Sequence, residues 1–380
     1  MKKPYRTANL KPGIRDFPPW SPRFWNGMLL GDWLRLLIRN RLHIDPLRLG
    51  IAFIITGCTM INSLLHRVQG LAYGRRIEQM SIKSSPLFII GHWRSGTTFL
   101  HELLTRDKRF AFPTTYACFA PNHFLVTAWI IPRLMRLLLP KKRPMDNMPV
   151  GFARPQEDEF ALANMGCPTP YLRTMFPNEP PCHLELLNME GVPADDLKRW
   201  KHDVVWFVKA LTSQSRKPLV LKSPPHTGRV GVLSELFPGA RFIHMTRDPY
   251  TLFASTRALW SALDSTQGLQ HPRNEHLKAY VFTCFEMMYR GFEQQRGRID
   301  PKRICDVRYE DLTSEPLEQL EAIYKKLGLG DFEQIRPALQ EYLTEIKDYQ
   351  PNRHEELDDG TKAEIRCRWK SYARKYDYTL

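Results

Sequence analysis

The sequence predicts an α/β fold, in which a parallel sheet is flanked by helices and preceded by a helical N-terminal extension. From residue 86 onward, short apolar runs alternate with stretches of helical periodicity, which is typical of parallel sheets with helices on both faces. The chain has 380 residues, of which 43% are hydrophobic and 25% are charged. This is the composition of a globular protein with a sizeable core.

Four apolar runs are predicted to be the buried strands. They are residues 86–91 (PLFIIG), 218–222 (PLVLK), 241–246 (RFIHMT) and 303–308 (RICDVR). The helices that follow them are expected at residues 97–104, at 229–237, from Pro249 onward, and at 317–327 with Gly328 as the cap. Ligands of such sheets bind at the carboxyl ends of strands, so the polar residues after the first three strands are the expected site of chemistry.

The remaining segments are assigned more coarsely. Residues 1–80, rich in Leu, Trp and Arg, are interpreted as the helical extension, and residues 81–380 as the main domain. Residues 110–215 break the rhythm of strands and helices, and we expect them to form an acceptor pocket over the sheet. No domain is assigned to the polar and aromatic tail, residues 348–380.

The charge balance points to an anionic partner. The chain carries 55 Lys and Arg against 40 Asp and Glu, a net charge of +15, which suits nucleic acid, an anionic membrane or a small polyanionic ligand. Because the sequence has no zinc-finger spacing, RNP-type motif or long basic run, no nucleic-acid partner is expected. The seven cysteines are scattered and never form CxxC, which argues against disulfides and structural zinc and indicates a reducing, cytoplasmic compartment.

Two apolar segments bear on membrane contact. Residues 47–65 and 123–139 are both interrupted by polar or basic residues, and the second runs into KKR at 141–143. A buried or amphipathic helix is the preferred interpretation of each, and peripheral membrane contact is the alternative. The N-terminus has no apolar h-region, so no cleaved secretory signal is expected.

The loop after the first strand predicts a phosphate cradle. Residues 91–98 read GHWRSGTT, which approaches the P-loop pattern GxxxxGK[ST] with Thr97 where the lysine would stand. A glycine turn before a helix presents backbone N–H groups to an anion, and Arg94, Ser95, Gly96, Thr97 and Thr98 are the expected contacts. The sheet is therefore expected to be P-loop-like.

A second anion site is expected at the end of the third strand. In RDPYTLFAS, Asp248 is a good N-cap and Pro249 a good first helical residue, so Arg247 stands at the carboxyl end of the strand. Ser255 lies about two turns into the helix and can return to the same crevice. A guanidinium and a hydroxyl can together bind one phosphate.

The chain resembles the PAPS-dependent sulfotransferase family, in detail its bacterial-type branch. Four features occur in the family's order: GHWRSGTT, LKSPPH, LFPGARFIHMTRDPYTLFAS, and VRYEDLTSEPLEQLEAIYKKLGL. The resemblance implies that residues 94–98 bind the 5′-phosphosulfate of PAPS (3′-phosphoadenosine 5′-phosphosulfate), and that Arg247 and Ser255 bind its 3′-phosphate. It also implies that Lys222 contacts the transferring sulfuryl group. The family's late cofactor loop has no clear match, and Arg353 in YQPNRH at 349–354 is the candidate contact.

The catalytic base is left open between two choices. Family members use a Glu or a His, which here means the pair Glu157 and Glu159 or else His226, while His92 and His101 are interpreted as structural. By analogy with phosphoryl transfer, the protein must align the reactants and neutralise the leaving oxygen. A sulfuryl group carries one fewer negative charge than a phosphoryl group, so Lys222 and Arg94 are expected to act without a metal.

Two other functions remain as alternatives. The first is a P-loop phosphoryl transferase, and the second is a non-catalytic, membrane-associated nucleotide-binding protein. The aromatic and apolar residues between 110 and 176 favour a hydrophobic, lipid-like hydroxyl acceptor, with a carbohydrate or a phenol still open.

Overall fold

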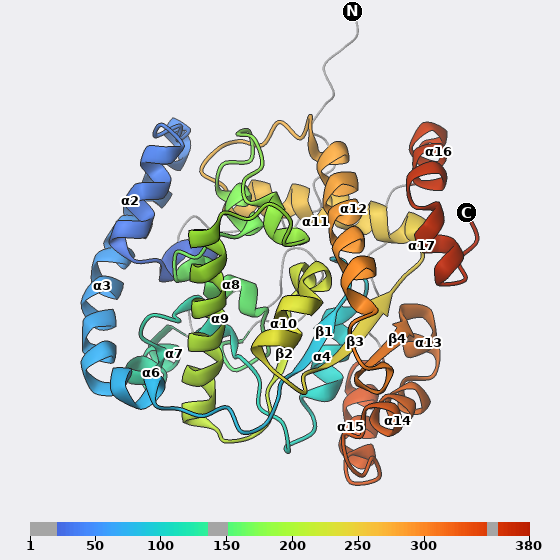
Figure 1. The fold of residues 1–380 in the computed structure, drawn as a ribbon. Helices are drawn as coiled ribbons and strands as arrows, with labels where there is room; N and C mark the ends of the chain where they lie inside the picture. Colours follow the sequence, from blue (N-terminus) through green and yellow to red (C-terminus); the bar gives the residue numbers. More distant parts are fainter. Residues whose placement is uncertain (1–20, 136–150, 348–355) are drawn as a thin grey trace, which may run out of the picture.

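A four-stranded parallel sheet lies inside the molecule, with its strands in the order β2-β1-β3-β4 (Figure 1). The computed structural model describes residues 21–135, 151–347 and 356–380. The strands are β1 (Leu87–Ile90), β2 (Val220–Lys222), β3 (Arg241–Thr246) and β4 (Ile304–Arg308). Each falls within a predicted apolar run, so the predicted α/β fold with a parallel sheet is confirmed.

Helices surround the sheet and form most of the remaining described structure. Those before β2 are α2 (Leu30–Arg39), α3 (Leu49–Glu78), α4 (Thr97–Leu104), α5 (Thr115–Phe119), α6 (Phe124–Thr127), α7 (Ile131–Leu134), α8 (Asp158–Asn164) and α9 (Ala194–Gln214). Those after β2 are α10 (Val230–Leu236), α11 (Pro249–Gln267), α12 (Leu277–Arg296), α13 (Tyr309–Ser314), α14 (Pro316–Leu327), α15 (Arg336–Glu345), α16 (Asp359–Arg368) and α17 (Lys370–Lys375). Short 3₁₀ helices are η1 (Phe24–Gly27), η2 (Pro46–Arg48), η4 (Pro170–Met175), η5 (Leu184–Leu187), η6 (Pro224–Arg229) and η7 (Pro301–Arg303).

The helix ends follow the capping chemistry of the sequence. Asp248 caps α11, since its side chain accepts a hydrogen bond of 2.8 Å from the Thr251 amide. Gly328 ends α14 with a left-handed backbone (φ 61°), as expected. The helix expected at 229–237 is shorter, because two prolines at 224 and 225 start a 3₁₀ turn, η6, that occupies the chain up to Arg229.

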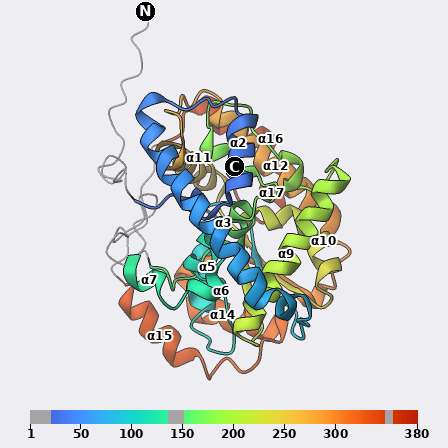
Figure 2. The same cartoon turned by 90° about the vertical axis from the view of Figure 1, so that its left-hand side faces the viewer.

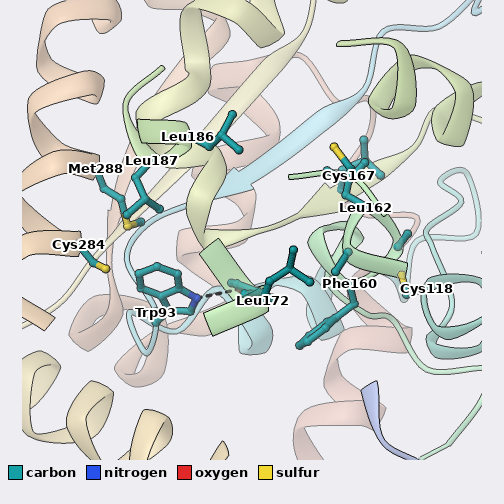
Figure 3. Packing of buried hydrophobic residues seen from close by; sticks show 14 of the residues in the cluster. Trp93, Cys118, Phe160, Leu162, Cys167, Leu172, Leu186, Leu187, Cys284 and Met288 are labelled. Atoms are coloured by element: carbon teal, nitrogen blue, oxygen red, sulfur yellow. Dashed lines mark hydrogen bonds between the residues drawn. The ribbon is translucent and has the colours of Figure 1, made fainter. Parts of the chain in front are cut away.

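The side chains of β1 alternate between two hydrophobic clusters. Phe88 and Ile90 belong to the larger cluster, and Leu87 and Ile89 to the smaller one, which packs under α4 and α14. Figure 3 shows part of the larger cluster, with Trp93 from the loop after β1, Phe160 from α8 and Leu172 from η4. The loop that follows β1 is therefore held from below by a dense apolar core.

The helical extension shares this core. Trp25, Trp33 and Ile55 are buried and belong to the same cluster as Phe88. In Figure 2, α3 lies across the face turned to the viewer, outside the sheet. Residues 21–79 are thus helical and packed on the rest of the chain, and a domain boundary at residue 80 stays a prediction.

The described part of the C-terminal tail also packs on the main body. Trp369, between α16 and α17, stacks on Phe285 of α12, with ring centroids 3.8 Å apart and an interplanar angle of 15°. The Tyr372 hydroxyl accepts a hydrogen bond of 2.9 Å from the Arg247 amide. The tail therefore supports the end of β3.

A fully buried ion pair fixes α8 against η6. The Arg229 guanidinium donates to both carboxylate oxygens of Glu159, at 2.6 and 3.0 Å, and neither side chain is exposed. Thr169 also donates to Glu159, and Arg229 donates to the Leu186 carbonyl. A buried charge without its partner is costly, so each residue depends on the other.

We therefore predict that Glu159→Ala destabilises the fold. The substitution leaves the Arg229 guanidinium buried without its counter-ion, and the free energy of unfolding should fall by about 3–5 kcal/mol. Denaturant unfolding measures this change. Glu235→Ala is the control, because Glu235 is exposed and pairs with Lys201 only at 3.8 Å. A Glu159→Ala protein with wild-type stability would contradict a structural role for the pair.

Candidate active site

The loop between β1 and α4 turns through left-handed backbone conformations. Gly91 has φ 137°, Arg94 has φ 71° and Gly96 has φ 96°. A Cβ on Gly96 would lie 2.3 Å from the Tyr309 ring, so the ring and the backbone conformation together require glycine there. This tight turn brings the N-terminus of α4, with its free N–H groups and the hydroxyls of Thr97 and Thr98, to the end of the sheet.

Arg247 and Ser255 reach the same loop. Arg247 Nη1 donates to the Arg94 carbonyl at 2.8 Å, and Arg94 Nε donates to Ser255 Oγ at 2.8 Å. The two predicted anion sites therefore meet on one side of the sheet. Their assignment to the two ends of one nucleotide stays a prediction.

Two tyrosines position Arg247. The guanidinium lies 4.1 Å from the centre of the Tyr309 ring, and the Tyr372 hydroxyl bonds both backbone groups of Arg247. Burial lowers the pKa of Arg247. The nearby positive charge of Arg94 lowers this pKa further, whereas the electrostatic interaction with Tyr309 raises it in part. No carboxylate within residues 21–135, 151–347 and 356–380 lies at ion-pair distance from its guanidinium. An anionic ligand would relieve this crowding of positive charge.

These tyrosines were missed from the sequence. Tyr309 follows β4, and the rule that polar residues at strand ends form the site would have found it if applied to the fourth strand. Tyr372 lies 125 residues after Arg247, and no local pattern connects the two.

Lys222 connects the phosphate loop to the acceptor side. Its Nζ lies 3.3 Å from Thr98 Oγ1 and 2.6 Å from Glu157 Oε1, and its side chain is 2% exposed. As the last residue of β2, Lys222 is carried to this point by the strand that neighbours β1. A buried ammonium is stable only with polar or charged partners. The contacts of Lys222 therefore hold the loop and Glu157 in place on either side of it.

The carboxylate of Glu157 is held by Lys222 and Tyr171. Its Oε2 accepts a hydrogen bond of 2.5 Å from the Tyr171 hydroxyl, which in turn accepts one of 2.8 Å from Trp93 Nε1. Burial and the adjacent carboxylate of Glu157 raise the pKa of Tyr171 well above its usual value, so its hydroxyl stays protonated. This chain of bonds orients the carboxylate of Glu157.

The other candidate bases lie apart from Glu157. Glu159 is enclosed in its pair with Arg229, and His226 Nε2 lies 2.6 Å from Asp158 Oδ2 with no exposed surface. Burial alone would raise the pKa of Asp158, but the charge and hydrogen bond of His226, with a bond from Ser223, hold it below the usual value. The geometry therefore favours Glu157 over Glu159 and His226.

A cavity of about 280 Å³ opens beside Glu157. Aromatic and aliphatic side chains dominate its lining, among them Trp93, Tyr116, Phe160, Trp260, Ile61 and Leu65. Glu157 is the only carboxylate among the described residues that line it. A pocket was expected within residues 110–215, and this cavity is built partly from that segment and partly from η1, α3 and α11. Its use as an acceptor pocket stays a prediction.

The remaining predicted residues have clear positions. Ser95 is buried, and its hydroxyl has no hydrogen-bond partner among the described residues. Burial lowers the pKa of His92 to about 3, which keeps the ring neutral inside the aromatic core. His101 is buried in α4. Arg353 lies outside the described residues.

The donor set fits a nucleotide with phosphate groups at two positions. Arg94, Arg247, Ser255 and the α4 N-terminus offer cations, hydroxyls and amides, which are the groups that bind phosphate. Within the described part of the chain, no group of three or more His, Cys, Asp or Glu could hold a metal ion.

Comparison with known proteins identifies the family. A sequence profile described as the sulfotransferase family matches residues 86–334. The omega-hydroxy-beta-dihydromenaquinone-9 sulfotransferase Stf3 of Mycobacterium bovis is 42% identical over 359 residues, covering 94% of this chain and 92% of the relative. The protein of the same name from Mycobacterium tuberculosis gives the same values.

Solved structures agree on the fold. The crystal structure of sulfotransferase STF1 from Mycobacterium tuberculosis H37Rv superposes with a TM-score of 0.63 and 18% identity, covering 90% of this chain and 91% of that one. Sulfotransferase STF9 from Mycobacterium avium gives a TM-score of 0.62 and 18% identity, covering 93% and 98%. The family profile covers the sheet and the phosphate loop, and the mycobacterial relatives align with 94% of the chain. The chain therefore belongs to the sulfotransferase family and is an enzyme of that class.

Proposed function

We propose that the enzyme transfers a sulfuryl group from PAPS to the hydroxyl of an apolar, lipid-like acceptor, with Glu157 as the general base. One observation carries the proposal: Lys222 Nζ touches both Thr98 of the phosphate loop and Glu157 of the apolar cavity. The donor side and the acceptor side of the reaction therefore meet at a single ammonium group.

On the donor side, each predicted residue has a proposed role in binding PAPS. Residues 94–98 would hold the 5′-phosphosulfate of PAPS, and Arg247 with Ser255 would hold its 3′-phosphate. When bound, PAPS supplies a sulfuryl group attached to a phosphate leaving group. Lys222 and Arg94 would neutralise the negative charge that grows on the bridging oxygen as that bond breaks. We infer that these cations serve in place of a metal.

On the acceptor side, Glu157 would remove the hydroxyl proton. Its carboxylate faces the cavity and is oriented by Tyr171 and Lys222, so an acceptor oxygen in the cavity comes within hydrogen-bond reach. The ammonium of Lys222 also holds Glu157 Oε1 at 2.6 Å, which fixes the carboxylate next to the phosphate loop. After transfer, the proton rests on Glu157 and is released to solvent.

The acceptor is proposed to be a long lipid with a terminal hydroxyl. The cavity is lined mainly by apolar side chains, and the mycobacterial relatives are named for omega-hydroxy-beta-dihydromenaquinone-9. A cavity of about 280 Å³ takes the hydroxyl-bearing end of such a molecule, while the rest would extend through the opening. We also propose a cytoplasmic location, because all the cysteines are free thiols, as in a reducing compartment.

The donor assignment predicts the effect of Arg247→Ala. Losing a charged hydrogen-bond donor should weaken binding of adenosine 3′,5′-bisphosphate by roughly 1.5–3 kcal/mol, which corresponds to about 10-fold to 150-fold. Isothermal titration measures this affinity. Arg298→Ala, a change at an exposed arginine outside the site, should leave it unchanged. Mg²⁺-dependent binding of ATP in place of the bisphosphate would instead support the phosphoryl-transferase alternative.

The base assignment predicts a separate effect for Glu157→Gln. Glutamine keeps the size of the side chain, and its single carbonyl oxygen can still accept from Lys222, but its NH₂ group cannot accept from Tyr171 and the amide cannot take a proton. Turnover should therefore fall by about 10²–10⁴-fold while bisphosphate affinity stays near wild type. Steady-state transfer of labelled sulfate from PAPS to an ω-hydroxylated prenyl quinone measures the turnover. The exposed control Glu235→Gln should behave as wild type. Full activity of Glu157→Gln would return the assignment to His226 or another group.

A further inference from the structure

The exposed hydrophobic side chains of this protein gather in one region. Every large hydrophobic residue that is exposed in the described chain lies within residues 34–71 or 129–134. These stretches cover α2, α3 and the α6–α7 segment, and none of the exposed large hydrophobic residues belongs to the described chain after residue 150. Such a concentration marks an interaction surface, because scattered exposure is what an ordinary soluble surface shows.

Helix α3 exposes large apolar side chains, and between Thr59 and Gln69 the side chains that it buries are polar. On its outer side, Phe53 is 74% exposed, Leu64 is 64% exposed and Leu71 is 91% exposed. On its inner side, the polar residues Asn62 and Gln69 are buried. A helix on the surface of a water-soluble protein has the opposite arrangement, so the outer side of α3 is built for an apolar environment.

The buried polar residues tie α3 to the protein along its length. Asn62 donates to the Met28 carbonyl at 3.0 Å and bonds His123 Nε2 at 3.1 Å. Gln69 accepts a bond of 2.8 Å from the Leu125 amide. By length and composition, residues Pro46–Glu78 could cross a membrane, but these bonds hold one side of α3 against η1 and α6. Only its outer side is available, which suits a helix lying flat in a bilayer interface.

The charges around this side match an anionic lipid surface. Residues 46–77 contain no Asp or Glu, whereas Arg67, Arg75 and Arg76 of α3 are exposed. Arg133 is exposed beside Leu134 on α7. Apolar side chains flanked by arginines are the composition of interfacial helices, and each arginine adds attraction to anionic lipid.

The acceptor cavity opens within this surface. Its lining includes Ile61 and Leu65 of α3 together with Ile131 and Met135 of the α7 segment, and Ile61 is 61% exposed. The same cavity reaches Glu157. Helices α3 and α7, which contribute lining residues, both lie on the face that Figure 2 turns to the viewer.

We propose that this face, α3 with the α6–α7 segment, docks on an anionic lipid bilayer, so that a lipid acceptor passes from the bilayer directly into the cavity. Docking itself depends only on the surface, whereas delivery of the acceptor rests on the proposed function. An apolar tail can then stay in the bilayer while its hydroxyl end reaches Glu157, and no exposed lipid has to cross water.

Vesicle flotation of the full chain tests the docking. Wild type should float with vesicles of phosphatidylglycerol and phosphatidylcholine, and less with pure phosphatidylcholine or at high salt. The variant Phe53→Ser/Leu64→Ser/Leu71→Ser removes apolar contacts at exposed positions outside the cavity lining, and should bind at least about tenfold more weakly. Circular dichroism and thermal unfolding confirm that this variant remains folded.

A matched pair of charge reversals separates docking from general electrostatics. Arg67→Glu/Arg75→Glu should weaken flotation, whereas Arg298→Glu/Lys302→Glu, with the same change of net charge at exposed positions elsewhere, should not. Equal flotation of the triple serine variant and wild type would overturn the proposal. So would a wild type that fails to float and forms a dimer that the serine variant abolishes, because the face would then be a protein interface.

Activity distinguishes this inference from the proposed function. With farnesol dispersed in buffer, the triple serine variant should transfer sulfate as fast as wild type. With a long hydroxylated prenyl lipid embedded in anionic vesicles, its rate should fall at least about tenfold. Equal loss with both acceptors would overturn the delivery route. Absence of transfer by wild type with either acceptor would sink the proposed function, while flotation would still decide the docking.

Discussion

The contact between Lys222 and Glu157 is the constraint on which the rest of the site depends. A lysine that is 2% exposed must have charged or polar partners, and the structure gives it Thr98 on one side and Glu157 on the other. Because Lys222 ends β2, which pairs with β1, the sheet sets the position of Lys222 relative to the phosphate loop. Ser223, the next residue, bonds the Glu159 amide and Asp158, which places the start of α8 and Glu157 beside Lys222. The other oxygen of the Glu157 carboxylate accepts a hydrogen bond from Tyr171, whose hydroxyl is in turn held by Trp93. The proposed donor and acceptor sides are thus joined by strand pairing together with the contacts of Lys222.

Sequence patterns predicted the parts of the site that depend on local chain geometry. A strand, a glycine turn and a helix start within a dozen residues were enough to find the loop at 94–98, and the Asp248–Pro249 cap placed Arg247 at the end of β3. These signals are local because φ, ψ and capping depend on neighbours in the chain. Local patterns could not decide which of Glu157, Glu159 and His226 is the base. Glu157 and Glu159 are two residues apart, yet one meets Lys222 at the cavity and the other meets Arg229 in the core. Only the positions of partners 65 and 70 residues away decide between them.

The same limit applies to the supports of Arg247 and to α3. Tyr372 reaches Arg247 from a tail that showed no recognisable pattern, because its role comes from docking on α12 and not from its own segment. For residues 47–65, apolar composition predicted a helix but not which side of it would be buried. In the middle of α3 the buried side takes Asn62, which satisfies backbone carbonyls at η1, while large apolar side chains such as Leu64 and Leu71 are left outside. Hydrogen-bond satisfaction inside the protein therefore decides the orientation of α3 against its hydropathy.

The exposed apolar side of α3 and the buried ammonium of Lys222 provide the two different environments that the proposed reaction needs. Sulfuryl transfer needs a polar, cationic site for the donor, whereas a long lipid acceptor is stable only in apolar surroundings. The cavity joins these environments, with Glu157 at the cationic end and Ile61 at the apolar surface. If α3 were turned so that Phe53 and Leu71 faced inward, Asn62 and Gln69 would lose their partners. The bonds that fix α3 also fix Ile61 and Leu65 in the cavity lining, and with them the route by which the proposed apolar acceptor would approach Glu157, the proposed base.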